Sequence, residues 1–95
     1  MNQYELAAVT FIVKAVEMLC DDDNQSITAT TKRVSEETKP GLDRVTNVVF
    51  AHNGTEIADI DISVDIYGTI YIRHEDGQLT KTRVSEIADY IYKQI

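Results

Sequence analysis

The chain has 95 residues, a length that suits one domain with a single modest hydrophobic core. Sixteen Asp and Glu against nine Lys and Arg give a net charge of −7, which argues against a protein whose whole surface binds nucleic-acid phosphates. The same charge favours solubility and attraction to basic partners. A hydrophobic fraction of 43% excludes wholesale disorder, so we expect one folded domain over residues 1–95.

The beginning of the chain predicts neither a secretory signal nor a membrane span. Its apolar stretch, residues 6–13, has no basic start and no small-residue cleavage site, and it is too short to cross a bilayer. Cys20 is the single cysteine and therefore has no internal disulfide partner, which agrees with a reducing compartment. We expect a cytoplasmic protein that does not associate with membranes.

The first predicted element is a helix that opens with an N-x-x-E pattern at Asn2 and Glu5, similar to a capping box. Between Leu6 and Cys20, apolar residues cover most of the helix circumference and leave only a narrow polar strip. An apolar arc this wide exceeds what one packing partner needs. We expect the helix to be buried on two sides, either centrally in the domain or across a homodimer interface.

The middle of the chain admits two interpretations. Residues 29–38 and 42–52 have roughly helical spacing and are separated by Lys39-Pro40-Gly41, which suits a sharp break between two helices. Residues 45–50 are nevertheless rich in β-branched and aromatic residues, and the following Asn53-Gly54 is a strong hairpin-turn signal. Upstream Ser and Thr residues that suit helix caps favour the helical interpretation.

With helices at these positions, residues 26–74 resemble a winged helix-turn-helix domain. Lys39 departs from that pattern, because the turn usually has Gly there, and Ser35 stands where a small residue, usually Ala, is expected. The resemblance implies an α+β fold in the order α-α-α-β-β-α, with a long N-terminal helix and an amphipathic C-terminal helix. The alternative fold is an α-β-β-β-α antiparallel meander packed by two helices. That layout resembles double-stranded RNA-binding domains but lacks their basic cluster.

A β-hairpin is the clearest prediction for the second half of the chain. Residues 57–66 alternate between apolar and polar, as in a half-buried strand, and residues 69–74 supply its partner. A three-residue loop, Ile66-Tyr67-Gly68 with Gly68 in the left-handed region, keeps the faces of the two strands matched. This register places Asp61 opposite Arg73 as a cross-strand ion pair.

The last predicted element is an amphipathic helix with one apolar stripe of ordinary width. Thr80 or Thr82 is its expected N-terminal cap. The apolar positions follow the i, i+3, i+4, i+7 pattern at Val84, Ile87, Ala88, Ile91 and Ile95.

No catalytic or metal-binding signature is present in the sequence. His52 and His74 have no ligands at zinc spacing, and the chain has neither a Gly-rich phosphate loop nor a nucleophile paired with a base. The acidic run from Asp59 only superficially resembles a calcium loop, since Val64 and Ile70 replace its essential Gly and bidentate Glu. We expect no enzyme activity, no cofactor and no metal.

The winged-helix resemblance implies a nucleic-acid-binding regulator, for example in transcription. Arg and Asn are suitable readers of base edges, and Lys and Arg are suitable contacts for phosphates. The candidate nucleic-acid-binding residues are Lys32, Arg33, Lys39, Arg44, Thr46 and Asn47.

The alternative function is an acidic protein-binding inhibitor or nucleic-acid mimic, of the kind that phages and mobile elements use, docking on a basic partner protein. Same-face carboxylates two residues apart along a strand lie about 6.6–7 Å apart, close to phosphate spacing. The candidate surface for this function comprises Glu56, Asp59, Asp61 and Asp65. In both interpretations we expect a homodimer formed through the helix of residues 6–20 and the C-terminal helix.

Overall fold

Two helices and a five-stranded antiparallel sheet make up the described part of the chain in this computed structural model, which covers residues 3–20, 26–35, 45–73 and 78–95, with only the backbone at 33–35. Each strand pairs with its neighbours in sequence, in the spatial order β1-β2-β3-β4-β5. The elements are α1 (Gln3–Leu19), β1 (Ile27–Ser35), β2 (Val45–His52), β3 (Thr55–Val64), β4 (Ile70–Arg73), β5 (Thr80–Thr82) and α2 (Val84–Tyr92).

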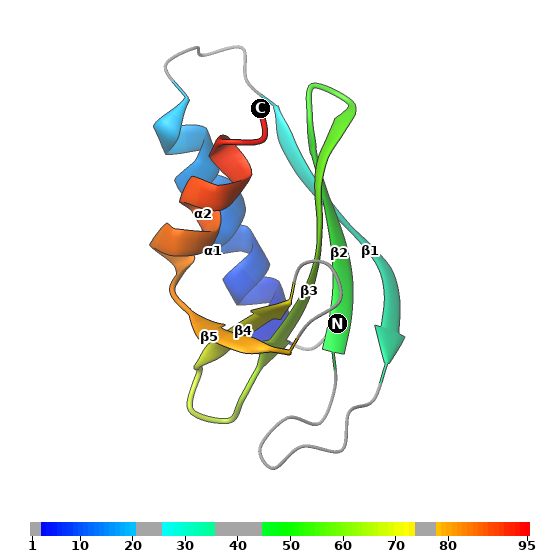
Figure 1. Ribbon diagram of the computed structural model, residues 1–95, viewed down its shortest axis with the longest axis vertical. Helices are drawn as coiled ribbons and strands as arrows, with labels where there is room; N and C mark the ends of the chain where they lie inside the picture. Colours follow the sequence, from blue (N-terminus) through cyan, green and yellow to red (C-terminus); the bar gives the residue numbers. More distant parts are fainter. Residues whose placement is uncertain (1–2, 21–25, 36–44, 74–77) are drawn as a thin grey trace.

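Both helices lie on the same side of the sheet and pack against each other, as Figure 1 shows. The core fills the space between this helix layer and the facing side of the sheet, which we call the inner face. Its members alternate along each strand, as the pleat requires, and recur along the helices at helical spacing. Fully buried core residues are Ile12, Val16, Val48, Phe50, Ile60, Ile62, Ile87 and Ile91.

The hairpin predicted in the second half of the chain is confirmed. Val64 pairs with Ile70, the Asp65 N–H donates to the Thr69 carbonyl, and Gly68 has a φ of 83°, as the three-residue loop requires. The register places Asp61 opposite Arg73, as expected. Strict alternation in β3 explains this success, because a register shift of one residue would have turned its apolar side chains to the other face.

The α+β class is confirmed, but the helices predicted for residues 29–38 and 42–52 are wrong over the described residues, which form β1 and β2. All six residues from 45 to 50 are buried, so β2 is covered on both faces and shows no alternation. An apolar run of this kind has no period that separates a strand from a helix. The two helices and the antiparallel sheet agree with the alternative meander, which gains two strands, β1 and β5.

The Asn53-Gly54 turn joins β2 to β3, and both of its residues have positive φ, 49° and 86°. This is the geometry that favours Asn-Gly in a two-residue hairpin loop. Asn53 also fixes the start of β1, because its side-chain Oδ1 accepts the Ser26 N–H at 2.9 Å and its own N–H donates to the Ser26 carbonyl at 2.8 Å. Asn53 therefore belongs to the β2–β3 turn and also anchors the residue before β1.

The C-terminal helix is present, and its apolar stripe is confirmed at the buried residues Ile87, Ala88 and Ile91. The predicted cap is wrong. Thr80 and Thr82 pair with β4 as part of β5, and the N-cap position of α2 is Arg83, which forms no side-chain capping hydrogen bond. The residues that were predicted to cap the helix instead form β5, a third strand beside the β3–β4 hairpin.

A buried polar contact connects α1 to β2. Glu5 is 1% exposed and Thr46 is fully buried on the inner face, and the Thr46 Oγ1 donates to the Glu5 Oε2 at 2.6 Å. The other predicted partner of Glu5, Asn2, lies outside the described residues. A carboxylate in an apolar core is tolerated only when hydrogen bonds compensate for its lost hydration, so this contact specifies where α1 sits on the sheet.

We expect Thr46→Val to lower the free energy of unfolding by about 1–3 kcal/mol, because it removes a donor from a buried acceptor while keeping the volume of the side chain. Urea denaturation measures the loss. Thr10→Val is the matched control, since the Thr10 hydroxyl donates to the Leu6 carbonyl at 2.8 Å on the exposed side of α1. Equal losses in the two variants would contradict the assigned role of the buried contact.

Candidate functional site

Polar side chains gather on the face of the sheet that points away from the helices, which we call the outer face. Alternation along β2, β3 and β4 places Asn47, Asp61 and Arg73 side by side there, with Asn47 opposite Asp61 and Asp61 opposite Arg73. Asp59, two residues before Asp61 on β3, lies on the same face. Three neighbouring strands thus contribute to one polar cluster. Its most distant members in the sequence, Asn47 and Arg73, are 26 positions apart.

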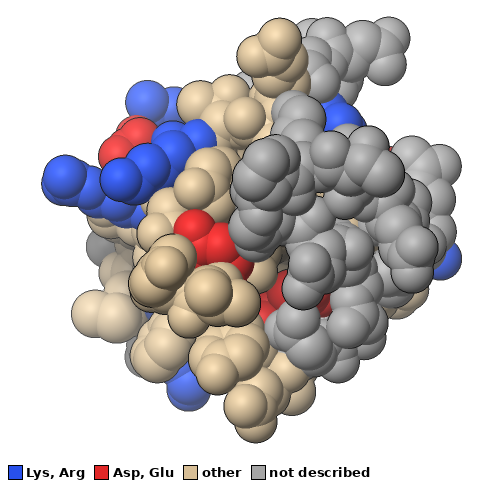
Figure 2. Space-filling view, turned by 90° about the horizontal axis from the view of Figure 1, so that it is seen from below, with Lys and Arg blue, Asp and Glu red and all other residues tan. Residues whose placement is uncertain are grey.

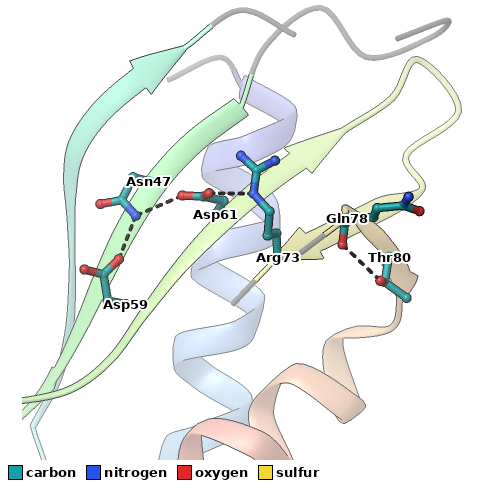
Figure 3. A network of polar contacts seen from close by, with 6 residues as sticks. All are labelled: Asn47, Asp59, Asp61, Arg73, Gln78 and Thr80. Carbon is teal, nitrogen blue, oxygen red and sulfur yellow. Dashed lines mark hydrogen bonds and ion pairs between the residues drawn. The ribbon is translucent and has the colours of Figure 1, made fainter. Parts of the chain in front are cut away.

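Asn47 is the centre of this cluster. Its side-chain Nδ2 donates to the Asp59 Oδ1 at 2.6 Å and to the Asp61 Oδ1 at 2.9 Å, so one amide bridges two carboxylates (Figure 3). Asn47 itself is 7% exposed. A buried amide with both hydrogens committed has a fixed orientation, and it holds the two acidic side chains in place.

Arg73 extends the cluster toward β4. Its Nε donates to the Asp61 Oδ2 at 2.9 Å, and both side chains are largely shielded from solvent, with 22% and 17% of their surfaces exposed. A charge-assisted hydrogen bond in such surroundings is stronger than the same contact at the surface. Asp61 therefore connects β3 to both neighbouring strands, since one of its oxygens accepts from Asn47 on β2 and the other accepts from Arg73 on β4.

Asp65 also has a local structural role. Its Oδ1 accepts the N–H groups of Tyr67 and Thr69, both at 2.9 Å, and shapes the loop between β3 and β4. Its Oδ2 accepts the Tyr71 hydroxyl at 3.3 Å. Burial, and then the charge of Asp65 and the hydrogen bond to it, raise the pKa of the Tyr71 phenol above its ordinary value of 10.0.

Asp59 and Glu56 are the candidate acids that remain available to a partner. Both are exposed on β3, and no Lys or Arg of the described residues forms an ion pair with either. Glu56 lies next to the Asn53-Gly54 turn. Figure 2 is a view from below, of the end of the molecule opposite that turn, where acidic side chains are near the middle and Lys and Arg are mainly toward the periphery. Of the four predicted residues, Asp61 is the one paired with Arg73, and Asp59 and Glu56 are the exposed ones.

The described members of the predicted nucleic-acid-binding set lie on strands instead of the two expected helices. Lys32 is exposed on β1, and Arg33 belongs to the same strand. Lys39 and Arg44 lie outside the described residues. Thr46 and Asn47 follow one another on β2 and point to opposite faces, where each is buried and hydrogen-bonded within the protein.

The helix layer leaves large apolar side chains in contact with solvent. On α1, Tyr4, Phe11 and Met18 are 52%, 62% and 85% exposed, and their spacing of seven residues places them along one side of the helix. Tyr92 and Ile95, at the C-terminal end of α2, are also exposed. The wide apolar arc of the first helix is thus only partly explained by packing within one chain.

The described part of the chain contains neither a cluster of metal-ligating residues nor a membrane-spanning helix. No group of three or more His, Cys, Asp and Glu residues there is arranged to hold a metal ion. Neither described helix combines the length and the apolar composition needed to cross a bilayer. No protein-family model, curated protein or solved structure shows significant similarity to this chain.

Sequence analysis found the acidic residues of the cluster but missed the function of Asn47 within it. The alternation of β3 indicates that Asp59 and Asp61 share a face, and this requires only local information. The bridge from Asn47 depends on the register between β2 and β3. A strand assignment for residues 45–52 together with the Asn53-Gly54 turn would not have been enough, because a β-bulge beside Phe50 and Ala51 shifts the register by one residue. Without that bulge, a two-residue loop would place Asn47 opposite Ile60.

We expect the Asn47 bridge to appear as an energetic coupling between Asn47 and Asp59. In a double-mutant cycle of Asn47→Ala and Asp59→Ala, the coupling in unfolding free energy should be about 0.5–3 kcal/mol, because either change removes the same hydrogen bond. Urea denaturation of the four proteins measures it. The same cycle with Glu56→Ala in place of Asp59→Ala should give no coupling, and equal values in the two cycles would contradict the bridge.

Proposed function

We propose that this protein is a non-enzymatic binding module that docks on a basic partner protein through the acidic side chains of β3. The observation that carries this proposal is the Asn47 bridge, which holds Asp59 and Asp61 together on one face. The two residues are two positions apart on a strand, a backbone spacing of about 6.6–7 Å, and the shared amide draws their carboxylates closer together than that. Because the cluster is hydrogen-bonded before any partner arrives, binding would require little side-chain ordering.

The charge of the cluster supports a basic partner. Arg73 offsets Asp61, whereas Asp59 and the neighbouring Glu56 are exposed without an ion-pair partner among the described residues. The whole chain adds to this field with its net charge of −7. A negative surface of this kind attracts Lys-rich and Arg-rich segments and speeds their association at low ionic strength.

A protein partner is better supported than a nucleic acid. Sequence-specific DNA binding usually inserts a helix or β-ribbon into the major groove with free side chains at base edges. Here Thr46 and Asn47 are committed to hydrogen bonds inside the protein, and the acidic residues on β3 would repel phosphates. We therefore treat nucleic-acid binding as the competing hypothesis, which the experiments below also test.

A fluorescein-labelled hepta-arginine peptide is a direct probe of the proposed surface. We expect it to bind the wild-type protein at low salt, and Asp59→Lys to weaken binding at least fivefold in fluorescence anisotropy. Asp89→Lys is the matched control because Asp89 is an exposed acid on α2 and the substitution changes the net charge equally. This control should change the affinity less than twofold.

Two results would contradict the proposal. Equal weakening in both variants would mean that the peptide senses only the overall charge. A mobility shift of random-sequence duplex DNA at low salt and tens of micromolar protein, abolished by Lys32→Ala, would instead support the nucleic-acid function.

We also propose that the protein dimerises through its helix layer. The exposed side chains of Tyr4, Phe11 and Met18 support this, because apolar side chains along one side of a helix usually meet a partner. In an antiparallel arrangement of two α1 helices centred on Phe11, Tyr4 of one copy would oppose Met18 of the other. A second copy of the protein would thus cover the side of α1 that remains exposed in one chain, so that the wide apolar arc is buried on two sides.

We expect the wild-type protein to be dimeric in multi-angle light scattering at tens of micromolar, and Phe11→Ser to be monomeric with its helical circular dichroism unchanged. Lys93→Ser on α2 is the control, since Lys93 is exposed and pairs only with Asp89 one turn away. A monomeric wild-type protein would contradict the dimer.

A further inference from the structure

Strand β1 lies at the end of the sheet, so among the described strands it pairs on one side only, with β2. An unpaired strand edge presents a row of N–H and C=O groups that another extended chain can adopt as a pairing template. Proteins usually protect such edges with short strands, charged side chains or bulges. The positions of these protective features along β1 therefore indicate which part of its edge another chain could pair with.

Protection is present in only one half of β1. Lys32 and a bulge in the register between Thr31 and Arg33 interrupt its second half. The first half, residues 27–31, contains no charge, no Pro and no bulge. At the opposite end of the sheet, β5 is only three residues long and has Lys81 at its centre, as protected edges usually do.

The backbone of this first half directs three residues outward. The Asn53 N–H donates to the Ser26 carbonyl, so the paired backbone bonds to β2 continue at Thr28 and Thr30. The N–H and C=O groups of the alternate residues then point away from β2. These residues are Ile27, Ala29 and Thr31.

An apolar groove lies directly beside this edge, between β1 and the flank of α1. It has a volume of about 290 Å³, and its apolar lining comes from Leu6, Val9 and Val13 on α1 and from Ile27 and Ala29 on β1. Leu6 is 57% exposed there, without a partner side chain to cover it. A strand added to β1 would point every second side chain into this groove.

We propose that the edge of residues 27–31 and the adjoining groove form a binding site for an extended peptide segment of another protein that has alternating apolar side chains and no net charge. The outward backbone groups of Ile27, Ala29 and Thr31 pair with its main chain, and its alternate apolar side chains fill the groove against Leu6 and Val13. The charged side chains in the lining, Lys14 and Glu17, cancel. This neutrality distinguishes the site from the acidic surface around Asp59 on the outer face.

The probe for this site is a fluorescein-labelled peptide of sequence Glu-Val-Thr-Val-Thr-Val-Lys, in which apolar residues alternate. We expect it to bind at least tenfold more tightly than its isomer Glu-Thr-Thr-Val-Val-Val-Lys, which has the same composition but no alternation. Fluorescence anisotropy measures both affinities. In two-dimensional amide spectra, the largest shifts should fall on Ile27, Ala29 and Thr31.

Two substitutions test the two halves of the site. Ala29→Pro removes one outward N–H without breaking a bond to β2, and Leu6→Asp places a charge in the groove at an exposed position. Each should weaken the alternating peptide at least tenfold. Leu19→Asp is the matched control for Leu6→Asp, since Leu19 is 41% exposed on α1 and does not line the groove, and it should change the affinity less than twofold.

Several outcomes would overturn the proposal. Equal binding of the two peptides, equal effects of Leu6→Asp and Leu19→Asp, or amide shifts confined to β5 would each do so. Self-association of the free protein that Ala29→Pro abolishes would assign the edge to a second copy instead. Asp59→Lys should leave this peptide's affinity unchanged, so a failure here and a failure of the acidic docking surface remain distinguishable.

Discussion

The structure depends on strand β2 being held by polar contacts on both of its faces. On the inner face, the Thr46 hydroxyl reaches the buried Glu5 of α1, and on the outer face the Asn47 amide reaches two carboxylates of β3. These adjacent residues connect the helix layer, the middle of the sheet and the acidic surface. Buried polar groups must find partners of the right geometry, so they define one arrangement more sharply than apolar packing does.

The acidic residues of β3 illustrate how one chemical type takes on separate tasks. Asp61 is shared between Asn47 and Arg73, and Asp65 organises the loop to β4. These two charges are used to hold neighbouring strands and backbone groups. Asp59 and Glu56 lie on the same strand but are exposed, and they leave a net negative field at the surface. A strand with so many carboxylates is therefore partly a structural element and partly a surface for recognition.

How far the fold could be predicted depended on whether each segment had a period. β3 alternates, and α2 repeats at three and four residues, so the sequence predicted both, including the Asp61–Arg73 pair. β2 is buried on both faces and has no alternation, which made its β-branched run resemble a helix stripe. β1 is an edge strand of mainly Thr and charged residues, and β5 has three residues, so neither carries enough apolar pattern to be recognised.

The strictly sequential order of the sheet has a consequence for how the protein is made. Each strand pairs with the one synthesised just before it, so the sheet can form from local hairpins as the chain emerges from the ribosome. The helix layer behaves differently, because α1 is made first and α2 last, yet they pack against each other. Until α2 has been made, the core lacks Ile87 and Ile91, and α1 alone covers the apolar inner face.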